Sequence, residues 1–240
     1  MIQLEGRNPV HEALSQGLVT LIKLEYGHDT DAKIKQITDL ARKKGVKVDM
    51  VNRKQIERLS TTGKHQGIIA YAQTKIDWSL GKVLKETKKE VCIVVLDQVQ
   101  DPHNLGAIIR TGEGAGIDGV VIPKKGSAEL SNTVHRVSMG GSLNVPVWQT
   151  NIYPALKQMQ DEGLRIIGID ASGTKPYYEE KLSGAVAFVL GGESKGVNPT
   201  LLSKCDSVVN IPMRGKLDSL NVSVAAAVVI YERVRQQEIG

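Results

Sequence analysis

Asn104 and Arg110 belong to the first of three polar segments that could carry out chemistry. The segment 97–111 reads DQVQDPHNLGAIIRT and begins where an apolar run ends. Its loop holds no glycine, so it is neither a dinucleotide-binding turn nor a phosphate-binding P-loop. If a helix starts near Asn104, Arg110 lies about a turn and a half inside it. Its planar donors suit a phosphate or an emerging alkoxide, although a lone arginine more often pairs with a surface carboxylate.

A pair of glycines followed by a carboxylate forms the second segment. Residues 188–197 read FVLGGESKGV, with Gly191 and Gly192 directly before Glu193. Consecutive glycines allow backbone angles that are closed to other residues and let main-chain groups approach a ligand closely. The carboxylate could act as a base if apolar surroundings raise its pKa. A tight turn with an incidental acid explains the same residues, so both interpretations stay open.

The third segment ends in a hydroxyl and an amide placed before a helix. Residues 211–223 read IPMRGKLDSLNVS and lead into an apolar helix over 224–237. Ser219 and Asn221 lie where the first helical N–H groups need partners, so either can cap the helix. Capping requires only one of them.

Strands must position these three segments. Apolar runs alternate with helical patterns in the second part of the chain, at 92–96, 119–122, 164–169, 185–190 and 207–211. This alternation predicts the α/β class, with a parallel sheet covered by helices on both faces. Parallel sheets bind ligands beyond the carboxyl ends of their strands, where all three segments would lie. We therefore expect the segments to converge on one pocket.

The first part of the chain has the pattern of a smaller α/β module. Its strands are predicted at 18–24, 46–51 and 67–72. The polar and charged stretch that follows predicts a linker that includes a surface helix. The expected domains are 1–75 and 91–240, joined by a linker at 76–90.

Composition excludes several classes of protein. The 240 residues are 41% apolar and 24% charged, with a net charge of +5, which is typical of a globular protein. No apolar run approaches the roughly 18 residues that cross a bilayer, and the start lacks the pattern of a secretory signal. Cys92 and Cys205 are far apart and form no C-x-x-C pair, which argues against a disulfide framework or a zinc site. We expect a cytoplasmic protein with no membrane role.

The three segments together resemble the motifs of a known family. NLGAIIR at 104–110, LGGESKG at 190–196 and IPM with SLNVS within 211–223 resemble, in order and spacing, the three motifs of the SpoU (TrmH-type) RNA ribose 2′-O-methyltransferases of the SPOUT superfamily. GRNPVHEAL at 6–14 is similar to the usual opening of the family's substrate-binding extension. The resemblance covers nearly the whole chain. Its layout is most similar to members that act on a guanosine of large-subunit (23S) ribosomal RNA.

The resemblance implies a fold and a cofactor that periodicity would not predict. It implies a deep trefoil knot in the C-terminal parallel-sheet domain, whereas general topology rules favour an open doubly wound sheet. It also implies an N-terminal RNA-binding domain like a ribosomal protein, and a homodimer through the knotted domain. S-adenosylmethionine would lie in the knot, with no metal required. Its binding residues would be Gly191, Gly192, Ile211, Met213, Leu220 and Asn221.

The same resemblance implies a catalytic group made of Asn104, Arg110, Glu193, Ser219 and Asn221. In the family the matching arginine is proposed as a general base contributed by the partner subunit. A guanidinium has no lone pair to offer unless its site makes it neutral, so we expect Arg110 to hold a phosphate and stabilise an alkoxide instead. Asn104 would orient Arg110 or the RNA, and Glu193 would hold the arginine or the substrate. Ser219 and Asn221 would complete the pocket.

The charge distribution supports RNA binding by the first domain. Residues 1–75 contain 13 Lys and Arg against 8 Asp and Glu, while the rest of the chain is balanced. The basic positions that could contact phosphates are Arg7, Lys43, Lys44, Arg53, Lys54 and Lys64. Lys43 and Lys44 can equally compensate the dipole of their own helix. With only 4% aromatic residues, shape recognition of a structured RNA fits better than stacking on single strands.

The sequence leaves two alternative functions open. One is ribose methylation of transfer RNA in place of ribosomal RNA. The other is a non-catalytic or antibiotic-resistance relative that binds ribosomal RNA. The motif residues are all present, which argues against a chain that has lost catalysis.

Overall fold

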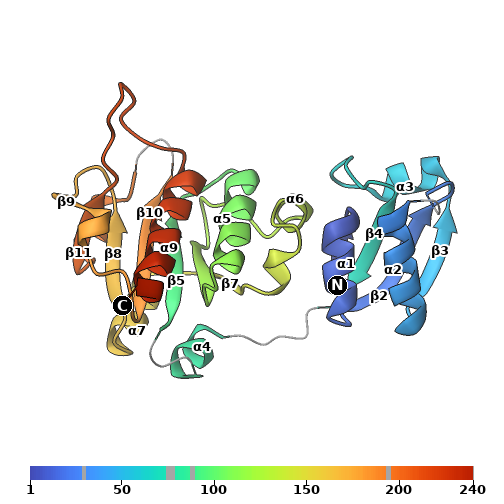
Figure 1. Cartoon of the computed structure of the whole chain (residues 1–240), viewed down its shortest axis with the longest axis horizontal. Coiled ribbons are helices and arrows are strands. Elements are labelled where there is room, and N and C mark those ends of the chain that lie inside the picture. The colour runs from blue at the N-terminus through green and yellow to red at the C-terminus, as the bar shows by residue number, and fades with distance from the viewer. Residues whose placement is uncertain (29–30, 74–78, 87–89, 193–195, 240) are drawn as a thin grey trace. The chain divides into compact units, whose positions relative to one another are not determined.

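The computed structural model divides the chain into two compact units (Figure 1). The first comprises Met1–Asp77 with Leu130–Asn144, and the second comprises Trp78–Glu129 with Val145–Gly240. The structure describes all residues except 29–30, 74–78, 87–89, 193–195 and 240. Each unit is built around a β-sheet of its own.

The first unit contains a four-stranded mixed sheet. Its elements in chain order are β1 (Ile2–Glu5), α1 (Arg7–Ser15), β2 (Val19–Glu25), α2 (Ala32–Lys43), β3 (Lys47–Val51), α3 (Arg53–Leu59), β4 (Ile68–Ala72), α6 (Asn132–Val137) and a 3₁₀ turn, η1 (Gly141–Leu143). The strand order is β1-β4-β2-β3. β1 and β2 run antiparallel to β4, whereas β3 runs parallel to β2.

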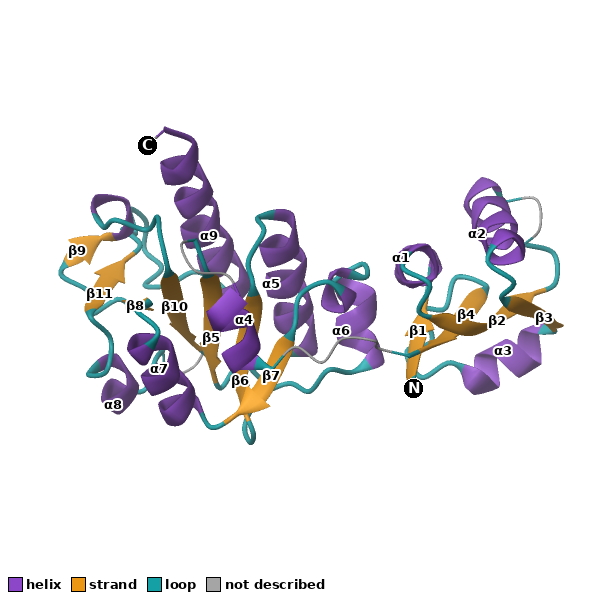
Figure 2. Ribbon diagram, turned by 90° about the horizontal axis from the view of Figure 1, so that it is seen from below, coloured by secondary structure: helices purple, strands orange, loops and turns teal. Residues whose placement is uncertain are grey.

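Helices cover both faces of this sheet (Figure 2). α1 and α2 lie on one face and α3 on the other. Val10 and Leu14 of α1 are fully buried in the same apolar cluster as Ile34 and Ile37 of α2. Their spacing of three or four positions places each pair on one side of its helix, which is why the helices dock along these residues. Ile56 anchors α3 in a smaller cluster.

The second unit contains a seven-stranded sheet. Its elements in chain order are α4 (Leu80–Glu86), β5 (Cys92–Asp97), α5 (Pro102–Gly114), β6 (Gly119–Pro123), β7 (Val147–Thr150), α7 (Ile152–Asp161), β8 (Arg165–Ile169), β9 (Lys175–Pro176), a 3₁₀ turn, η2 (Tyr177–Glu179), β10 (Val186–Gly191), α8 (Pro199–Leu202), β11 (Ser207–Asn210) and α9 (Val222–Ile239). The strand order is β7-β6-β5-β10-β8-β11-β9. Every neighbouring pair is parallel.

The chain order reverses in the middle of this sheet. From β5 the chain proceeds outward through β6 to β7, and it then returns to place β8 and β10 on the other side of β5. α5 and α9 cover one face, while α4, α7 and α8 cover the other (Figure 2). Because both faces are covered, every residue from Cys92 to Asp97 is buried.

The prediction of a parallel α/β sheet is confirmed, and each of the five apolar runs forms a strand. Three edge strands were not predicted: β7 and β9 of this sheet, and β1 of the smaller sheet. The first motif helix begins at Pro102, two residues before the predicted start near Asn104, with Asp101 as its cap. The predicted linker contains α4, whose Leu80 and Leu84 are buried in the core of the second unit. The trefoil knot stays a prediction.

Among the described residues, no helix combines the length and apolar character needed to span a membrane.

Candidate functional site

The carboxyl ends of β8, β10 and β11 surround a cavity of about 380 Å³, which we call the first cavity. Six residues of the predicted site line it: Gly191, Gly192, Ile211, Met213, Ser219 and Leu220. Five of these were assigned to the cofactor and Ser219 to catalysis. They come from the second and third motifs, so the structure brings these two motifs together at one place.

Three glycines, Gly191, Gly192 and Gly196, form one side of the first cavity, which we call the glycine floor. A Cβ on Gly191 would lie 1.9 Å from the carbonyl carbon of Gly196 and 2.2 Å from the nitrogen of Val197. A Cβ on Gly192 would lie 2.5 Å from the carbonyl oxygen of Gln98. No side chain fits at either position, because the space is already filled by backbone. The floor therefore offers main-chain groups to a ligand at close range.

The carboxylate of Asp170, directly after β8, also lines the first cavity. Its Oδ1 accepts hydrogen bonds from the N–H (3.0 Å) and Oγ (2.8 Å) of Ser172, and its Oδ2 accepts one from the N–H of Val197 (3.3 Å). Burial alone would raise the pKa of Asp170, but these hydrogen bonds outweigh burial and lower it below its ordinary value. The cavity thus carries a fixed negative charge at neutral pH. Asp170 was missed because an Asp after a strand is common and carries no signal of its own.

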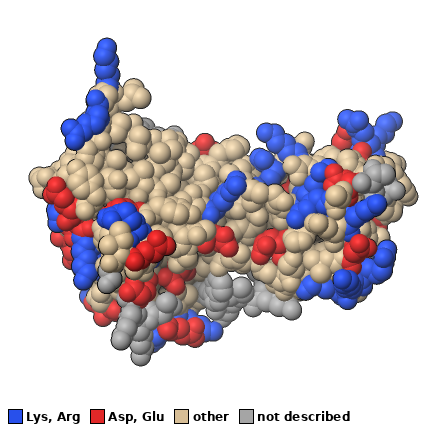
Figure 3. Space-filling model, in the orientation of Figure 1, with Lys and Arg blue, Asp and Glu red and all other residues tan. Residues whose placement is uncertain are grey.

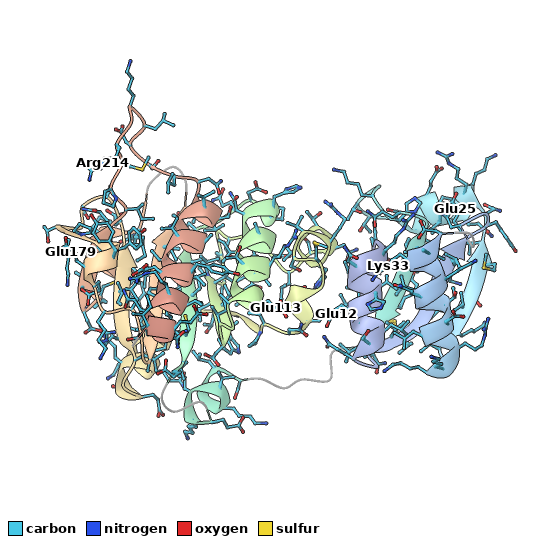
Figure 4. All side chains as sticks on the ribbon, viewed as in Figure 1. Glu12, Glu25, Lys33, Glu113, Glu179 and Arg214 are labelled. Atoms are coloured by element: carbon cyan, nitrogen blue, oxygen red, sulfur yellow. The ribbon has the colours of Figure 1, made fainter. Side chains whose placement is uncertain are left out.

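The loop 211–221 supplies the other wall of the first cavity and extends beyond the carboxyl end of the sheet (Figure 1). Arg214 projects from this loop (Figure 4) and is exposed. Ile211, Met213 and Leu220 contribute apolar lining. Asp218 and Ser219 of the same loop line the cavity as well. The first cavity therefore combines apolar lining with the carboxylates of Asp170 and Asp218, a combination that suits a ligand with both an apolar part and a positive charge.

Asn221 does not line the first cavity. Its Oδ1 caps α9 by accepting hydrogen bonds from the N–H (2.9 Å) and Oγ (2.6 Å) of Ser223. Its Nδ2 donates to Oδ1 of the buried Asn104 at 3.1 Å. Asn221 is therefore the capping residue, and Ser219 is the one left to the cavity. The bond to Asn104 ties the first motif to the third.

Arg110 is exposed on α5 and is not among the residues that line the first cavity of its own chain. Among the described residues, no carboxylate lies within ion-pair distance of its guanidinium. The ordinary role of a surface arginine, pairing with a neighbouring acid, is thus not seen in this part of the chain. Glu193, the acid of the second motif, lies outside the described residues.

The six basic residues predicted to contact RNA are placed at two ends of the first unit. Arg7 begins α1 and pairs with Asp31 at 2.7 Å. The Nζ of Lys44 donates a hydrogen bond to the carbonyl oxygen of Ser15, the last residue of α1. Lys44 therefore lies at the opposite end of α1 from Arg7, about 12 Å away along the helix axis. Lys43 neighbours Lys44, whereas Arg53, Lys54 and Lys64 are exposed on α3 and the loop after it. Figure 3 shows many Lys and Arg atoms over this unit.

Arg7 and Arg53 share a polar cavity of about 440 Å³ within the first unit. His28 and His65 line it as well, and Glu25 and Glu57 add carboxylates. Arg53 pairs with Glu57 at 2.9 Å. The structure thus joins two of the predicted RNA contacts in one concave site, with partly compensated charge.

The loop that follows α3 is held by a buried carboxylate. Glu5 accepts hydrogen bonds from the N–H of Thr61 (2.6 Å), the N–H of Thr62 (3.2 Å) and the Oγ of Ser60 (2.7 Å), and the hydroxyl of Thr62 also donates to it. Burial alone would raise the pKa of Glu5, but these bonds and one from Gln3 lower it to about 2. Glu5 therefore fixes the backbone that leads to Lys64.

Within the described part of the chain, no group of three or more His, Cys, Asp or Glu side chains could hold a metal ion.

Comparison with known proteins agrees with this geometry. The sequence profile of the SpoU rRNA Methylase family matches residues 91–231, and that of the RNA 2′-O ribose methyltransferase substrate binding family matches residues 3–77. A putative TrmH family tRNA/rRNA methyltransferase of Bacillus subtilis is 35% identical, over 97% of this chain and 94% of the relative. A 23S rRNA (guanosine-2′-O-)-methyltransferase of Xanthomonas axonopodis pv. citri is 37% identical, over 85% of this chain and 84% of the relative.

The fold is also shared with solved structures. The crystal structure of an AdoMet-bound rRNA methyltransferase from Sinorhizobium meliloti matches with a TM-score of 0.80 at 24% identity, over 98% of this chain and 87% of that chain. The SpoU rRNA Methylase profile, over residues 91–231, includes all three motifs, and the two relatives match most of the chain. The chain belongs to the SpoU rRNA methylase family.

Proposed function

We propose that this protein transfers a methyl group from S-adenosylmethionine to a ribose 2′-hydroxyl, of a guanosine in 23S ribosomal RNA. The observation that carries the proposal is the first cavity, where the second and third motifs of the family meet. The ribosomal substrate is supported by the relative named a 23S rRNA (guanosine-2′-O-)-methyltransferase. Such a substrate places the reaction in the cytoplasm.

The first cavity has the properties that the cofactor requires. Its volume of about 380 Å³ lies within the usual range for small-molecule sites. The glycine floor would meet the cofactor with main-chain groups, and Ile211, Met213 and Leu220 would enclose its apolar parts. Asp170 would complement its net positive charge. When bound, S-adenosylmethionine supplies an electrophilic methyl carbon on a sulfonium.

The chain itself must align the ribose and stabilise the oxygen that loses its proton. Arg110 has the donors for a phosphate and a developing alkoxide. Asn104 and Asn221 would fix the entry to the site, since their hydrogen bond holds α5 against the start of α9. Glu193 and Ser219 would complete the group.

A homodimer is part of the proposal. Arg110 does not line the first cavity of its own chain, which favours its delivery by a second copy. α9 exposes apolar surface that a partner could cover: Val224 is 48% exposed and Tyr231 is 51% exposed. A dimer through this helix would bury both residues.

The domain boundaries are proposed as predicted, with RNA binding in 1–75, a linker at 76–90 and catalysis in 91–240. The two family profiles, at 3–77 and 91–231, support this division.

The test is to map 2′-O-methyl groups in RNA from cells that lack the protein. We expect one guanosine of 23S ribosomal RNA to lose its methyl group and to regain it on complementation with the wild type. Loss of a methyl group from transfer RNA instead would assign the alternative substrate. Calorimetry with S-adenosylmethionine checks the remaining alternative, because a non-catalytic relative has no need to bind it.

A further inference from the structure

A second cavity lies at the same edge of the larger sheet, beyond the carboxyl ends of β5, β6 and β7. Its volume is about 380 Å³. Its lining includes the side chains of Gln98, Lys124, Lys125, Asn151, Tyr153 and Asn198. The carboxylate of Asp97 lines it too, and its Oδ2 accepts a hydrogen bond from the N–H of Asn198 at 2.9 Å. Neither the family motifs nor the predicted site includes any of these residues.

The two lysines are carried by a well-anchored turn. Gly126 has a φ of +77°, which lets the chain reverse directly after Lys125. The N–H of Ala128 donates to the carbonyl of Val99 at 2.8 Å, and the Oγ of Ser127 donates to the carbonyl of Pro123 at 2.8 Å. Lys124 and Lys125 are exposed. Neither forms an ion pair with a carboxylate in the described parts of the chain, so both charges are available to an anion.

The remaining lining groups suit a nucleobase. Asn151 and Asn198 use their Oδ1 atoms to cap α7 and α8, accepting from the N–H groups of Tyr153 (3.3 Å) and Thr200 (2.9 Å). Within the described residues, no partner is seen for the side-chain N–H groups of these two asparagines, so they can donate to a ligand. Tyr153 is 45% exposed and offers an aromatic face. Adjacent cations, amide donors and an aromatic ring match the phosphate, the edge and the face of a nucleotide.

One shared wall separates the second cavity from the first. Gln98 lines the second cavity and Gly192 lines the first. A Cβ on Gly192 would lie 2.5 Å from the carbonyl oxygen of Gln98, so the two backbones are in direct contact. The wall stands between β5 and β10, where the strand order reverses, which is the usual ligand position in open α/β sheets.

We propose that the second cavity binds a nucleotide of the substrate RNA next to the one that is methylated. Its phosphate lies at Lys124 and Lys125, and its base stacks on Tyr153. The methylated ribose must reach the first cavity, so the neighbouring nucleotide falls on the other side of the Gln98 wall. This inference rests on the proposed function, since it assumes an RNA substrate.

The test compares variants that remove equal charge. Lys124→Ala with Lys125→Ala should weaken binding of a 23S ribosomal RNA transcript about tenfold and lower the salt slope by about 1–2. The control, Lys157→Ala with Lys204→Ala, removes two exposed lysines of the same unit that do not line the cavity. It should bind RNA like the wild type. Binding of S-adenosylmethionine, measured by calorimetry, should be unchanged in both.

Tyr153 provides an independent readout. Tyr153→Ala should weaken RNA binding about tenfold, and Tyr153→Phe should retain it, because stacking needs the ring and not the hydroxyl. Unchanged RNA affinity in both the double-lysine variant and Tyr153→Ala would overturn the inference while leaving the proposed function intact. A wild-type protein that binds neither 23S ribosomal RNA nor transfer RNA would overturn both.

Discussion

The side-chain amide of Asn221 donates a hydrogen bond to the amide oxygen of Asn104 at 3.1 Å, across 117 positions of sequence. The same Asn221 caps α9 through its oxygen. One side chain therefore sets both the start of a helix and the position of a buried residue in another motif. These two roles can be separated by mutation.

We expect Asn221→Ser to keep the cap and lose the link, because a seryl oxygen can accept from the first helical N–H groups but cannot reach Asn104. Asn221→Ala should lose both and cost about 1 kcal/mol of unfolding free energy. Thermal unfolding should thus distinguish the variants, whereas both should lose methyl transfer. Wild-type turnover in Asn221→Ser would show that the link to Asn104 is dispensable.

Arg110→Ala should abolish methyl transfer and leave the affinity for S-adenosylmethionine unchanged, because Arg110 does not line the first cavity. If the arginine acts across a dimer, mixing Arg110→Ala with a cavity-blocking variant, Leu220→Trp, should restore activity. Random mixing would leave one working site in about half of the dimers, or about a quarter of wild-type activity. No recovery on mixing would place Arg110 in the site of its own chain.

Gly191→Ala should destabilise the fold by about 1–3 kcal/mol and weaken binding of the methyl donor, because the added methyl group overlaps the backbone at Gly196. Gly215→Ala is the matched control. It lies in the third motif loop with no heavy atom within 4 Å of the added Cβ. Chemical denaturation and calorimetry should leave the control like the wild type. Equal behaviour of the two variants would contradict the close packing of the floor.

Glu5→Gln should destabilise the protein in a pH-dependent way. The pKa of Glu5 falls from 4.5 to about 2 on folding, which corresponds to about 3 kcal/mol of stability from the ionised form. This stabilisation is complete above the unfolded pKa of 4.5 and is lost as the pH falls toward 2.

Urea denaturation at about pH 7 and about pH 3.5 measures this loss. The gap between the wild type and Glu5→Gln should shrink at the lower pH. Asp39→Asn, which changes an exposed acid, serves as the control. A gap that does not depend on pH would mean that the hydrogen bonds to Glu5 do not require its charge.

The central strands could be predicted because burial on both faces leaves a continuous apolar run, as in Cys92–Leu96. The edge strands of the larger sheet could not. β7 and β9 have four and two residues, and neither is buried on both faces, so no apolar run marks them. The start of α5 carried a readable signal, an Asp before a Pro, which the prediction near Asn104 overlooked.

The residues of the site likewise include some that could be predicted from the sequence and some that could not. Gly191, Ile211 and Leu220 were predicted to share a pocket, and the structure places them around one cavity. Asp170 could not be found, because its role depends on the N–H groups of Ser172 and Val197, the latter 27 positions away. The role of Glu5 could not be predicted from the sequence either. An acid in an amphipathic strand is expected to face water, and its partners lie about 55 positions further on.

The glycine floor also limits how this enzyme could be redesigned. Its shape is set by backbone packed on backbone, so, under the proposed function, substitutions there would disturb the packing before they changed which methyl donors are accepted. Selectivity toward analogues with bulkier transferable groups would instead come from Asp170, Met213 and Leu220. Substitutions of these side chains can change the size and charge of the cavity without moving the main chain.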